Sequence, residues 1–529
     1  MRRGMKCALL ILVGPAVCCF CPAQDTAGQR LTPSKMQKIA TVDPRYLSYN
    51  IEMVEVTGGR FWAPYKSTST EAAPKPPDPN QPAGIDPNLF HYRKPIDLSN
   101  PRLRRLAEAL GPSYVRVSGT WANSSYFQDS DAPTPAQPPE GFRGVLTRTE
   151  WKGVIDFAHA ADAQIVTSVA ISSGARNKEG VWTPEQAKAL FDYTREAGGT
   201  IAATEFMNEP TIPGPGNAPK GYDAAALARD AKLFGAFLRK ESPKTVYLGP
   251  GGVGEGAGGL ISSAFKMDLI KSDDILRDTG PIFDAFSYHF YGSVSKRCGG
   301  KMTVDKALTS EWLDATNGAE DFYAQLRDKY IPAKPMWLTE TAEAACGGDA
   351  LAAQYVDTFR FVNQLGTLAQ KGVKVVMHNT LAASDYGLLN EDTLEPRPDY
   401  WVAVLWKQTM GPTVLNPQAP SDPKVRVYAQ CLKGVAGGVA LVAMNTDEKE
   451  KHSMGISGAA EKYAITSDGL TSTAVSLNGK ALKVAEDGSL PKIHSQHVEG
   501  GTIELDPVSI TFLLIPSAKN PACMGEVAK

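Results

Sequence analysis

The chain has 529 residues, of which 43% are hydrophobic and 21% are charged, values close to those of an ordinary globular protein. This composition excludes a wholly disordered chain, a coiled coil and a protein with many membrane spans. The 55 basic and 57 acidic side chains give a formal net charge of −2 at pH 7. No overall attraction to nucleic acid or to acidic membranes is therefore expected.

Residues 1–23 have the order of a secretory signal, with basic residues first, then an apolar stretch and a small residue, Ala23. We expect cleavage after Ala23 and export, to the periplasm or as a secreted protein. The apolar stretch is too short for a membrane span, so no integral membrane association is predicted. A lipoprotein anchor is less favoured, because no small residue precedes the first of its candidate cysteines, Cys18, Cys19 and Cys21.

Eight short runs rich in β-branched and aromatic residues alternate mostly with helical patterns. The runs cover residues 46–55, 113–119, 164–172, 201–209, 245–250, 283–292, 334–340 and 373–380. Helices are predicted at residues 101–110, 149–162, 183–197, 222–241 and 349–372. Eight strands alternating with helices predict an α/β fold, a (β/α)8 TIM barrel. A doubly wound open sheet would give the same pattern and stays an alternative.

The predicted barrel spans residues 46–410, and the pattern of predicted secondary structure changes after it. Residues 411–529 contain short strands joined by turns with little helical periodicity, which predicts an appended all-β sandwich domain. The N-terminal segment 24–45 could pair with this sandwich. Proline-rich residues 73–87 and 131–141 cannot join a helix or sheet, and we expect them as surface loops over the active face.

Two carboxylates stand where catalytic groups of such a barrel belong, at the ends of strands. Glu209 closes the run ending EFMNE, and Glu340 closes the run ending MWLTE. Hydrolysis of a glycosidic bond needs such a pair, one acid to protonate the leaving oxygen and one carboxylate to attack or to activate water. Either glutamate alone reads equally well as a solvated loop acid. Glu205, deeper in its strand, and Glu343, in the expected loop after Glu340, rank second.

The remaining motifs do not indicate a cofactor or a metal. Residues 249–254, GPGGVG, match the glycine spacing of a dinucleotide loop but follow the fifth predicted strand instead of opening a βαβ unit. We interpret them as a barrel loop and predict no cofactor. The histidines are scattered, and no metal is predicted. His289 and Tyr291 end the sixth predicted strand and could point into the same pocket as the carboxylates, although a buried structural role for His289 is an equal alternative.

Several longer segments occur in a familiar order along nearly the whole chain. They are YLSYNIE, LGPSYVRVSGT, MNEP, YLGPGG, YHFYG, MWLTET and DYGLLNEDTLEPRPDYWVAVLWKQTMG. Together they resemble the heparanase family and its bacterial members, glycoside hydrolase family 79. The resemblance implies a (β/α)8 barrel with a β-sandwich, retaining hydrolysis and recognition of a β-linked glucuronic acid.

By position, the resemblance implies that Glu209 is the acid/base and Glu340 the nucleophile, while Asn208 holds the 2-hydroxyl of the sugar. It implies further sugar-binding roles for Glu52, Thr120 and Tyr291, and a glucuronate carboxylate site at Gly347, Gly348 and Tyr386. Neutral donors suit that task, because a carboxylate bound by amides needs no cation beside the catalytic acids.

Four cysteines lie beyond the signal, an even number in a chain for which export permits pairing. The resemblance implies a disulfide between Cys431 and Cys523. Cys298 and Cys346 are both expected on loops at the active face, and we infer that they form a second pair.

The substrate is expected to be a glucuronic-acid-containing glycoside or polysaccharide, and no nucleic acid partner is predicted. Members of the family that cleave sulfated chains carry basic clusters beside the cleft, whereas the matching stretches here hold only Arg176, Lys178 and Lys266. This favours an exo-acting β-glucuronidase. The alternatives are an endo-β-glucuronidase acting on a glycosaminoglycan-type polymer, a retaining β-glycosidase of other specificity and, least favoured, a non-catalytic carbohydrate-binding protein.

Overall fold

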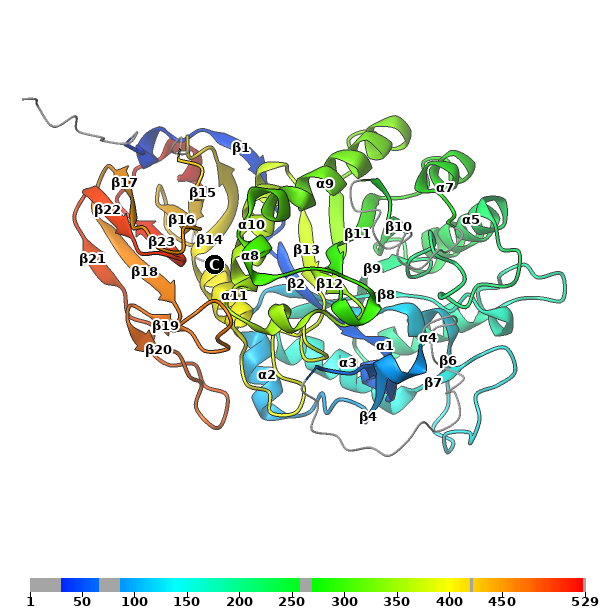
Figure 1. Cartoon of the computed structure of the whole chain (residues 1–529). Coiled ribbons are helices and arrows are strands. Elements are labelled where there is room, and N and C mark those ends of the chain that lie inside the picture. Colours follow the sequence, from blue (N-terminus) through cyan, green and yellow to red (C-terminus); the bar gives the residue numbers. More distant parts are fainter. Residues whose placement is uncertain (1–29, 66–85, 257–268, 419–421, 527–529) are drawn as a thin grey trace, which may run out of the picture.

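The computed structural model describes residues 30–65, 86–256, 269–418 and 422–526. Within these residues, eight parallel strands close into a barrel in the spatial order β2, β5, β8, β9, β10, β11, β12 and β13, with helices around it (Figure 1). The closed barrel excludes the open sheet and confirms the predicted fold class. The predicted signal, residues 1–23, and residues 73–85 of the first proline-rich segment lie outside the described residues.

Each of the eight predicted runs falls on one strand of the barrel. The strands are β2 (Leu47–Glu52), β5 (Ser113–Ser118), β8 (Ala163–Ser168), β9 (Ile201–Glu205), β10 (Val246–Gly252), β11 (Ala285–Val294), β12 (Met336–Ala345) and β13 (Val375–His378).

Three strand ends differ from the prediction. Strand β9 ends at Glu205, so Glu209 lies beyond the strand, in a turn where its own φ is 50°. Strand β12 continues to Ala345, which places both Glu340 and Glu343 inside the strand and corrects the expected loop position of Glu343. Strand β10 runs to Gly252, so most of the GPGGVG segment is strand and not loop.

The helices pack around the barrel. Their bounds are α1 (Met53–Thr57), α2 (Pro101–Glu108), α3 (Arg148–Ala160), α4 (Glu185–Glu196), α5 (Ala224–Glu241), α7 (Ser272–Thr279), α8 (Val304–Ala307), α9 (Ser310–Tyr330), α10 (Asp357–Gln370) and α11 (Pro398–Thr409). The sequence patterns predicted neither α9 nor α11. Helix α10 begins later than predicted, because Ala350–Ala353 form a short 3-10 turn, η7.

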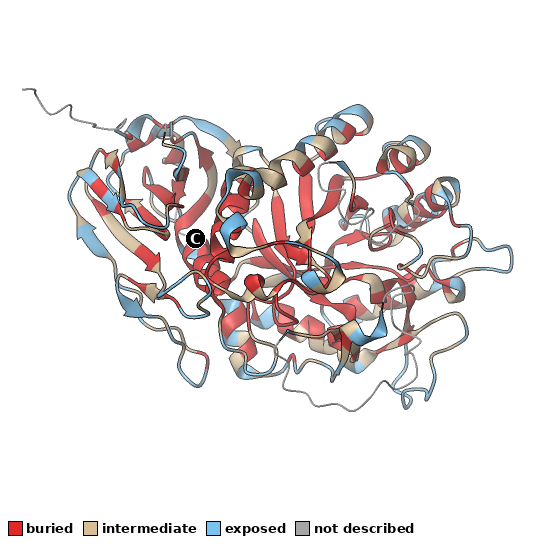
Figure 2. Ribbon diagram, viewed as in Figure 1, coloured by how far each residue is buried: buried red, intermediate tan, exposed pale blue. Residues whose placement is uncertain are grey.

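The barrel strands are buried, and the exposed residues lie on the outer helices and loops (Figure 2). An apolar layer that includes Tyr114, Ala203 and Trp337 fills one level of the barrel. Side chains two residues apart point to the same face of a strand. The next inward positions are therefore Arg116, Glu205 and Thr339 (one layer nearer the carboxyl ends of the strands), and this second layer is polar.

The C-terminal region is an all-β domain, as predicted. Its main sheet contains β1 (Lys38–Thr41), β14 (Met410–Leu415), β15 (Val425–Leu432), β16 (Val439–Asn445), β23 (Ser509–Ile515), β18 (Ala460–Thr466), β19 (Ser476–Leu477) and β20 (Lys480–Ala481), with β21 (Gln496–Val498) beside β18. Strands β17 (His452–Ile456) and β22 (Gly501–Leu505) form a second, two-stranded sheet. Shorter pairs, β3 (Gly59–Trp62) with β4 (Phe90–Arg93) and β6 (Ser125–Gln128) with β7 (Gly144–Thr147), decorate the barrel.

The N-terminal segment packs on this all-β domain. Strand β1 pairs antiparallel with β14, and Leu31 forms a bridge with Ile456. The predicted disulfide Cys431–Cys523 is present and ties β15 to the C-terminal 3-10 turn. Among the described residues, no helix combines the length and the apolar character that crossing a bilayer requires.

Candidate active site

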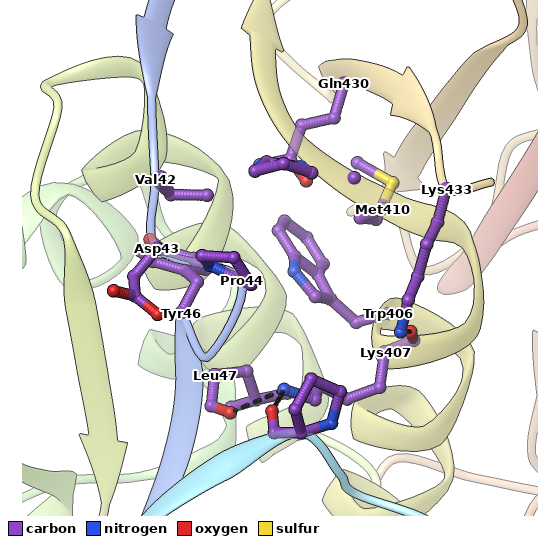
Figure 3. Close-up of a pocket in the computed structure, with 13 residues that line it drawn as sticks. Val42, Asp43, Pro44, Tyr46, Leu47, Trp406, Lys407, Met410, Gln430 and Lys433 are labelled. Atoms are coloured by element: carbon purple, nitrogen blue, oxygen red, sulfur yellow. Dashed lines mark hydrogen bonds between the residues drawn. The ribbon is translucent and has the colours of Figure 1, made fainter. Parts of the chain in front are cut away.

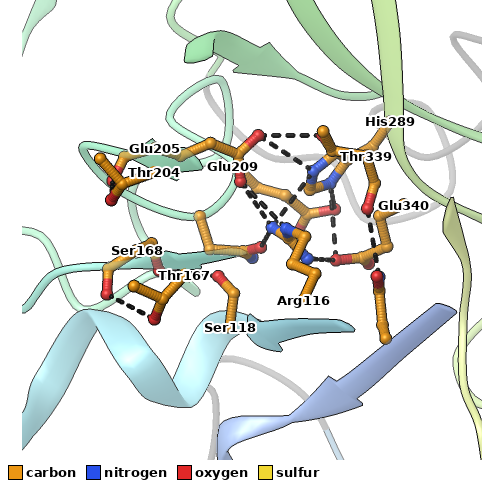
Figure 4. A network of polar contacts seen from close by, with 12 residues as sticks. Arg116, Ser118, Thr167, Ser168, Thr204, Glu205, Glu209, His289, Thr339 and Glu340 are labelled. Carbon is orange, nitrogen blue, oxygen red and sulfur yellow. Dashed lines mark hydrogen bonds and ion pairs between the residues drawn. The ribbon is translucent and has the colours of Figure 1, made fainter. Parts of the chain in front are cut away.

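Arg116 lies at the centre of the polar layer and is fully buried (Figure 4). Its Nη1 donates to Glu340 Oε2 at 2.8 Å, and its Nη2 donates to Glu205 Oε2 at 2.8 Å and to Asn208 Oδ1 at 2.7 Å. One guanidinium therefore connects strands β5, β9 and β12 with the turn that carries Asn208. A planar group with five donors suits this position, because it satisfies several acceptors from one fixed plane.

Glu340 and Glu209 face each other across this network. The Tyr291 hydroxyl donates to Glu340 Oε1 at 2.6 Å, while Arg116 holds the other oxygen. Glu209 Oε1 lies 3.2 Å from His289 Nδ1. One ligand atom each of Glu209, His289 and Glu340 lies within 4.8 Å of the others, so the two carboxylates lie close together. The structure brings together the two carboxylates that the sequence singled out.

The pKa values of Glu209 and His289 respond to burial and to the neighbouring charges. Burial raises the pKa of Glu209, and the negative charge of Glu340 raises it further against the hydrogen bond with His289. Burial would lower the pKa of His289, but Glu340 and Glu209 outweigh this effect and raise it. Glu209 is therefore prepared to carry a proton beside a carboxylate that Arg116 and Tyr291 stabilise.

Glu205 has a supporting position. Its carboxylate accepts from Arg116 and from the Thr339 hydroxyl, at 2.9 Å. Burial raises the pKa of Glu205, but the adjacent Arg116 charge dominates and holds it below its usual value. Glu205 therefore provides the permanent negative charge that keeps Arg116 in place.

Asn208 is held rigidly, with one face of its side chain available. Its backbone N–H donates to Asn123 Oδ1 at 2.8 Å, and its backbone oxygen accepts from Asn123 Nδ2 at 3.0 Å. Its Oδ1 accepts from Arg116, which fixes the amide so that the NH2 group is the donor left for a ligand. Neither Asn123 nor Arg116 was singled out from the sequence.

Glu52 ends strand β2 and is buried at the edge of the site. Its Oε2 has no hydrogen-bond partner among the described residues, and its pKa is raised by burial and then by Glu340. A Cβ on Gly119 would lie 1.5 Å from this oxygen, and Gly119 has a φ of 88°, so only glycine fits there. Thr120 follows in a 3-10 turn.

The turn after β12 carries the residues implied for carboxylate recognition. Gly347 and Gly348 both have a φ of 81°, a conformation that favours glycine. A Cβ on Gly348 would come within 3.0 Å of the Tyr386 backbone nitrogen, so this glycine and the buried Tyr386 are in close contact. The disulfide Cys298–Cys346, as inferred from the sequence, ties this turn to the segment after β11.

Glu343 supports the same turn through a hydrogen bond. Its Oε2 accepts from the Asp349 backbone N–H at 2.9 Å, and its Oε1 is buried without a partner among the described residues. Burial raises the pKa of Glu343 to about 8, and the neighbouring Asp357 adds to the rise. Glu343 is thus a structural acid and not a competitor of Glu340.

The Glu209–His289–Glu340 cluster is also close enough to hold a cation, since each residue offers one ligand atom. The Arg116 guanidinium already supplies a positive charge at 2.8 Å from Glu340. The prediction that the protein uses no metal stays a prediction.

A separate small cavity lies at the opposite end of the barrel (Figure 3). It has a volume of about 70 Å³ and is lined by Tyr46, Trp406, Lys407 and Gln430 among others. Lys407 donates to the backbone oxygens of Leu47, at 3.1 Å, and of Pro112. None of the catalytic candidates lines it, which agrees with active sites at the carboxyl ends of barrel strands.

A closed (β/α)8 barrel with two glutamates facing one pocket at its carboxyl end is the arrangement of a glycoside hydrolase. The family profile described as "Glycosyl hydrolase family 79, N-terminal domain" matches residues 94–366. The chain belongs to glycoside hydrolase family 79, as the resemblance indicated, and is a glycoside hydrolase.

Relatives of known name extend the similarity beyond this range. Heparanase of Mus musculus is 26% identical over 487 residues, covering 81% of this chain and 88% of the relative. Hyaluronoglucuronidase of Hirudo nipponia is 27% identical over 487 residues, covering 81% and 92%. The solved structure of a 4-O-alpha-L-rhamnosyl-beta-D-glucuronidase from Fusarium oxysporum covers 92% of this chain and 99% of its own, with a TM-score of 0.61 and 11% identity. At that identity the structural match shows the fold alone.

Proposed function

We propose that the protein is a retaining, exo-acting β-glucuronidase whose catalytic pair is Glu209 and Glu340. The observation that carries the proposal is the pocket in which the two glutamates have ligand oxygens within 4.8 Å of each other. Retaining enzymes place their carboxyl groups ~5–5.5 Å apart, whereas inverting enzymes need ~6.5–9.5 Å to admit a water molecule. The names of the relatives, a heparanase and a hyaluronoglucuronidase, support a glucuronide as the substrate.

The reaction proceeds in two displacements. The Glu340 carboxylate, bound by Arg116 and Tyr291, attacks the anomeric carbon, and Glu209 donates its proton to the leaving oxygen. The bond to the leaving group breaks as the glycosyl–Glu340 ester forms. Glu209, now ionised, then takes a proton from water, which attacks the anomeric carbon and releases glucuronate with retained configuration. The charge on Glu340 disappears in the intermediate, which removes one cause of the raised pKa of Glu209.

The rest of the pocket suits a glucuronate. Asn208 offers its NH2 group to the 2-hydroxyl, and Glu52, whose pKa is raised by burial and then by the nearby charge of Glu340, borders the same site. The backbone amides of Gly347 and Gly348, together with Tyr386, would receive the carboxylate.

A sulfated polymer finds little positive charge here. Arg176, one of the few basic residues of the matching stretches, is buried and pairs with Asp230 at 2.6 Å. Its charge is already compensated and is not available to a sulfate. This supports a substrate of low sulfation. We further propose that the chain is exported, on the order of residues in its first 23 positions.

The test is hydrolysis of an aryl β-glucuronide beside the matching β-glucoside and β-xyloside, with Glu340→Gln as the inactive control. Release from the glucuronide alone is expected, and equal release from the glucoside would contradict carboxylate recognition. On a glucuronic-acid-terminated oligosaccharide, free glucuronate should be the first product. Appearance of shorter oligosaccharides without free glucuronate would show endo action instead.

A further inference from the structure

A large cavity lies outside the catalytic site, where the barrel meets the all-β domain. It has a volume of about 490 Å³, within the usual size of small-molecule sites, ~300–1,000 Å³. Its walls come from the segment after β13, from the 3-10 turn η7 and from the loops around β19 and β20 (Figure 1). Both domains are therefore needed to form it.

The lining combines aromatic surface with uncharged polar groups. Tyr65 is 39% exposed, and the Arg297 guanidinium stacks on its ring at 4.1 Å. Trp401 forms another part of the wall. Gln354 also lines the cavity, and its Oε1 is buried with no hydrogen-bond partner among the described residues. Aromatic faces together with amide and hydroxyl groups are what a sugar ring requires, since it presents apolar C–H faces and a rim of hydroxyls.

The charges of the cavity are largely compensated and give an anionic ligand no advantage. Four carboxylates line it, those of Asp385, Glu391, Asp392 and Glu395, against two cations, those of Arg397 and Lys483. The Arg397 Nη1 is already engaged by three backbone oxygens. Three of the carboxylates are themselves paired with cations, Asp385 with Arg297, Glu391 with Arg93 and Glu395 with Arg102. The lining therefore offers a sulfate or a uronate no cluster of unpaired positive charge. A neutral sugar unit needs no such charge.

The cavity is connected to the catalytic pocket through Asp385. The Asp385 backbone N–H donates to the Gly347 oxygen at 3.1 Å, and its carboxylate accepts from Arg297 at 3.0 Å. Arg297 in turn donates to the Gly348 oxygen at 3.3 Å. The turn implied for reading the glucuronate carboxylate therefore shares a wall with the second cavity.

We propose that this cavity is a second, non-catalytic glycan-binding site, which takes neutral sugar units of the polysaccharide or oligosaccharide that carries the glucuronide. This inference rests on the proposed function only for the identity of that substrate. The site would hold a large substrate while a small aryl glucuronide uses the catalytic pocket alone.

The test is binding of neutral tetrasaccharides to the wild-type protein by titration calorimetry, using xylotetraose, cellotetraose and N-acetylchitotetraose, with a sulfated heparan tetrasaccharide as the anionic comparison. Ala474→Trp fills the cavity, because Ala474 is exposed and lines it. Ser517→Trp is the matched control, an exposed position in the turn after β23 that does not line the cavity.

At least one neutral tetrasaccharide should bind more tightly than the sulfated one, and Ala474→Trp should weaken it by about tenfold or more, or ~1.4 kcal/mol. Ser517→Trp should not, and both variants should keep wild-type kcat/KM on an aryl β-glucuronide. Absence of binding by all three neutral probes, tighter binding of the sulfated probe, or equal binding by Ala474→Trp would overturn the proposal. Neutral binding without glucuronide hydrolysis would reject the proposed activity and leave this site standing.

Discussion

Arg116 and Arg360 are both buried in this barrel among carboxylates, and acids beside the two differ in pKa. Arg116 bonds directly to Glu205 and Glu340, and the pKa of Glu205 is lowered because that charge outweighs burial. Arg360 bonds through two nitrogens to Asp357 but lies 3.8 Å from Asp399, whose two carboxylate oxygens have no partner among the described residues. Burial and the neighbouring Asp357 raise the pKa of Asp399 well above its usual value.

The difference shows what determines the charge of a buried acid. A carboxylate that receives a guanidinium directly stays ionised, whereas one left with burial and a like charge takes up a proton. The Arg116 cluster keeps its charge for chemistry. Near Arg360, burial and like charge raise the pKa values of Asp399 and Glu343, and Glu343 supports the turn that carries Gly347 and Gly348.

The largest expected effect distinguishes two glutamates of strand β12, Glu340 beside Arg116 and Glu343 nearer Arg360. Glu340→Gln should lower kcat on an aryl β-glucuronide by about 10⁴-fold or more, as loss of a nucleophile does. Glu343→Gln, three residues along β12, should change kcat only a few-fold, because it contacts the Asp349 backbone and not the catalytic pair. Circular dichroism of both variants checks the fold. Comparable losses in the two variants would refute the assignment of separate roles.

The next effect tests the protonated partner of Glu340. Glu209→Gln should reduce kcat by about 10²–10⁴-fold on glucuronides with poor leaving groups, since proton donation is lost. It should affect activated dinitrophenyl glucuronides much less in the first step. In the wild type, kcat/KM should fall as pH rises through the raised pKa of Glu209, because the proton to be donated is then absent. A loss of kcat of the same size on both kinds of glucuronide would argue against Glu209 as the acid.

A smaller change concerns specificity. Tyr386→Phe removes the hydroxyl proposed to bind the glucuronate carboxylate, and a hydrogen bond to a charged group is worth about 1.5–3 kcal/mol. The expected result is a loss of kcat/KM on the glucuronide of about 10–150-fold. Any side activity on the β-glucoside should not fall with it. Steady-state kinetics on both substrates measure the ratio, and a parallel loss would mean that Tyr386 supports the fold and not the carboxylate.

The smallest effect is on stability and follows from the Arg360 side of the comparison. Glu343 has a folded-state pKa of about 8, against an ordinary glutamate pKa of 4.5. Between these two pH values the folded state binds a proton that the unfolded state lacks, so Glu343 makes stability decrease as pH rises, by at most ~1.4 kcal/mol per pH unit.

Glu343→Gln should therefore be as stable as the wild type near pH 4.5 and increasingly more stable toward pH 8. Urea unfolding at several pH values measures this difference, with the exposed Glu311→Gln as the control. A difference that does not change with pH would show that Glu343 is ionised throughout.

Much of the barrel could be predicted from the sequence, because its strands follow from the local pattern of residue types. Runs of β-branched and aromatic residues predicted each barrel strand, and Glu209 and Glu340 stand near the ends of the predicted strands. The sequence could not show that β12 continues through Glu343, because the alanines and glutamate of residues 342–345 have low strand propensity and the continuation depends on pairing with β11. Helix α11 was missed because apolar residues surround it on all sides and mask the helical period.

The central arginine was missed for a different reason. Arg116 lies in SYVRVSG, where a charged residue inside an otherwise uncharged strand was a signal of a buried partner. Its acceptors, Glu205, Asn208 and Glu340, lie far along the chain on other elements. Only the closed barrel shows that they meet.

The most direct test of the catalytic account is the anomer first released from an aryl β-glucuronide, observed by proton NMR before mutarotation. Double displacement through Glu340 predicts that β-glucuronic acid appears first and then equilibrates with the α-anomer. If α-glucuronic acid appears first, the enzyme inverts configuration, and the assignment of Glu340 as nucleophile is wrong.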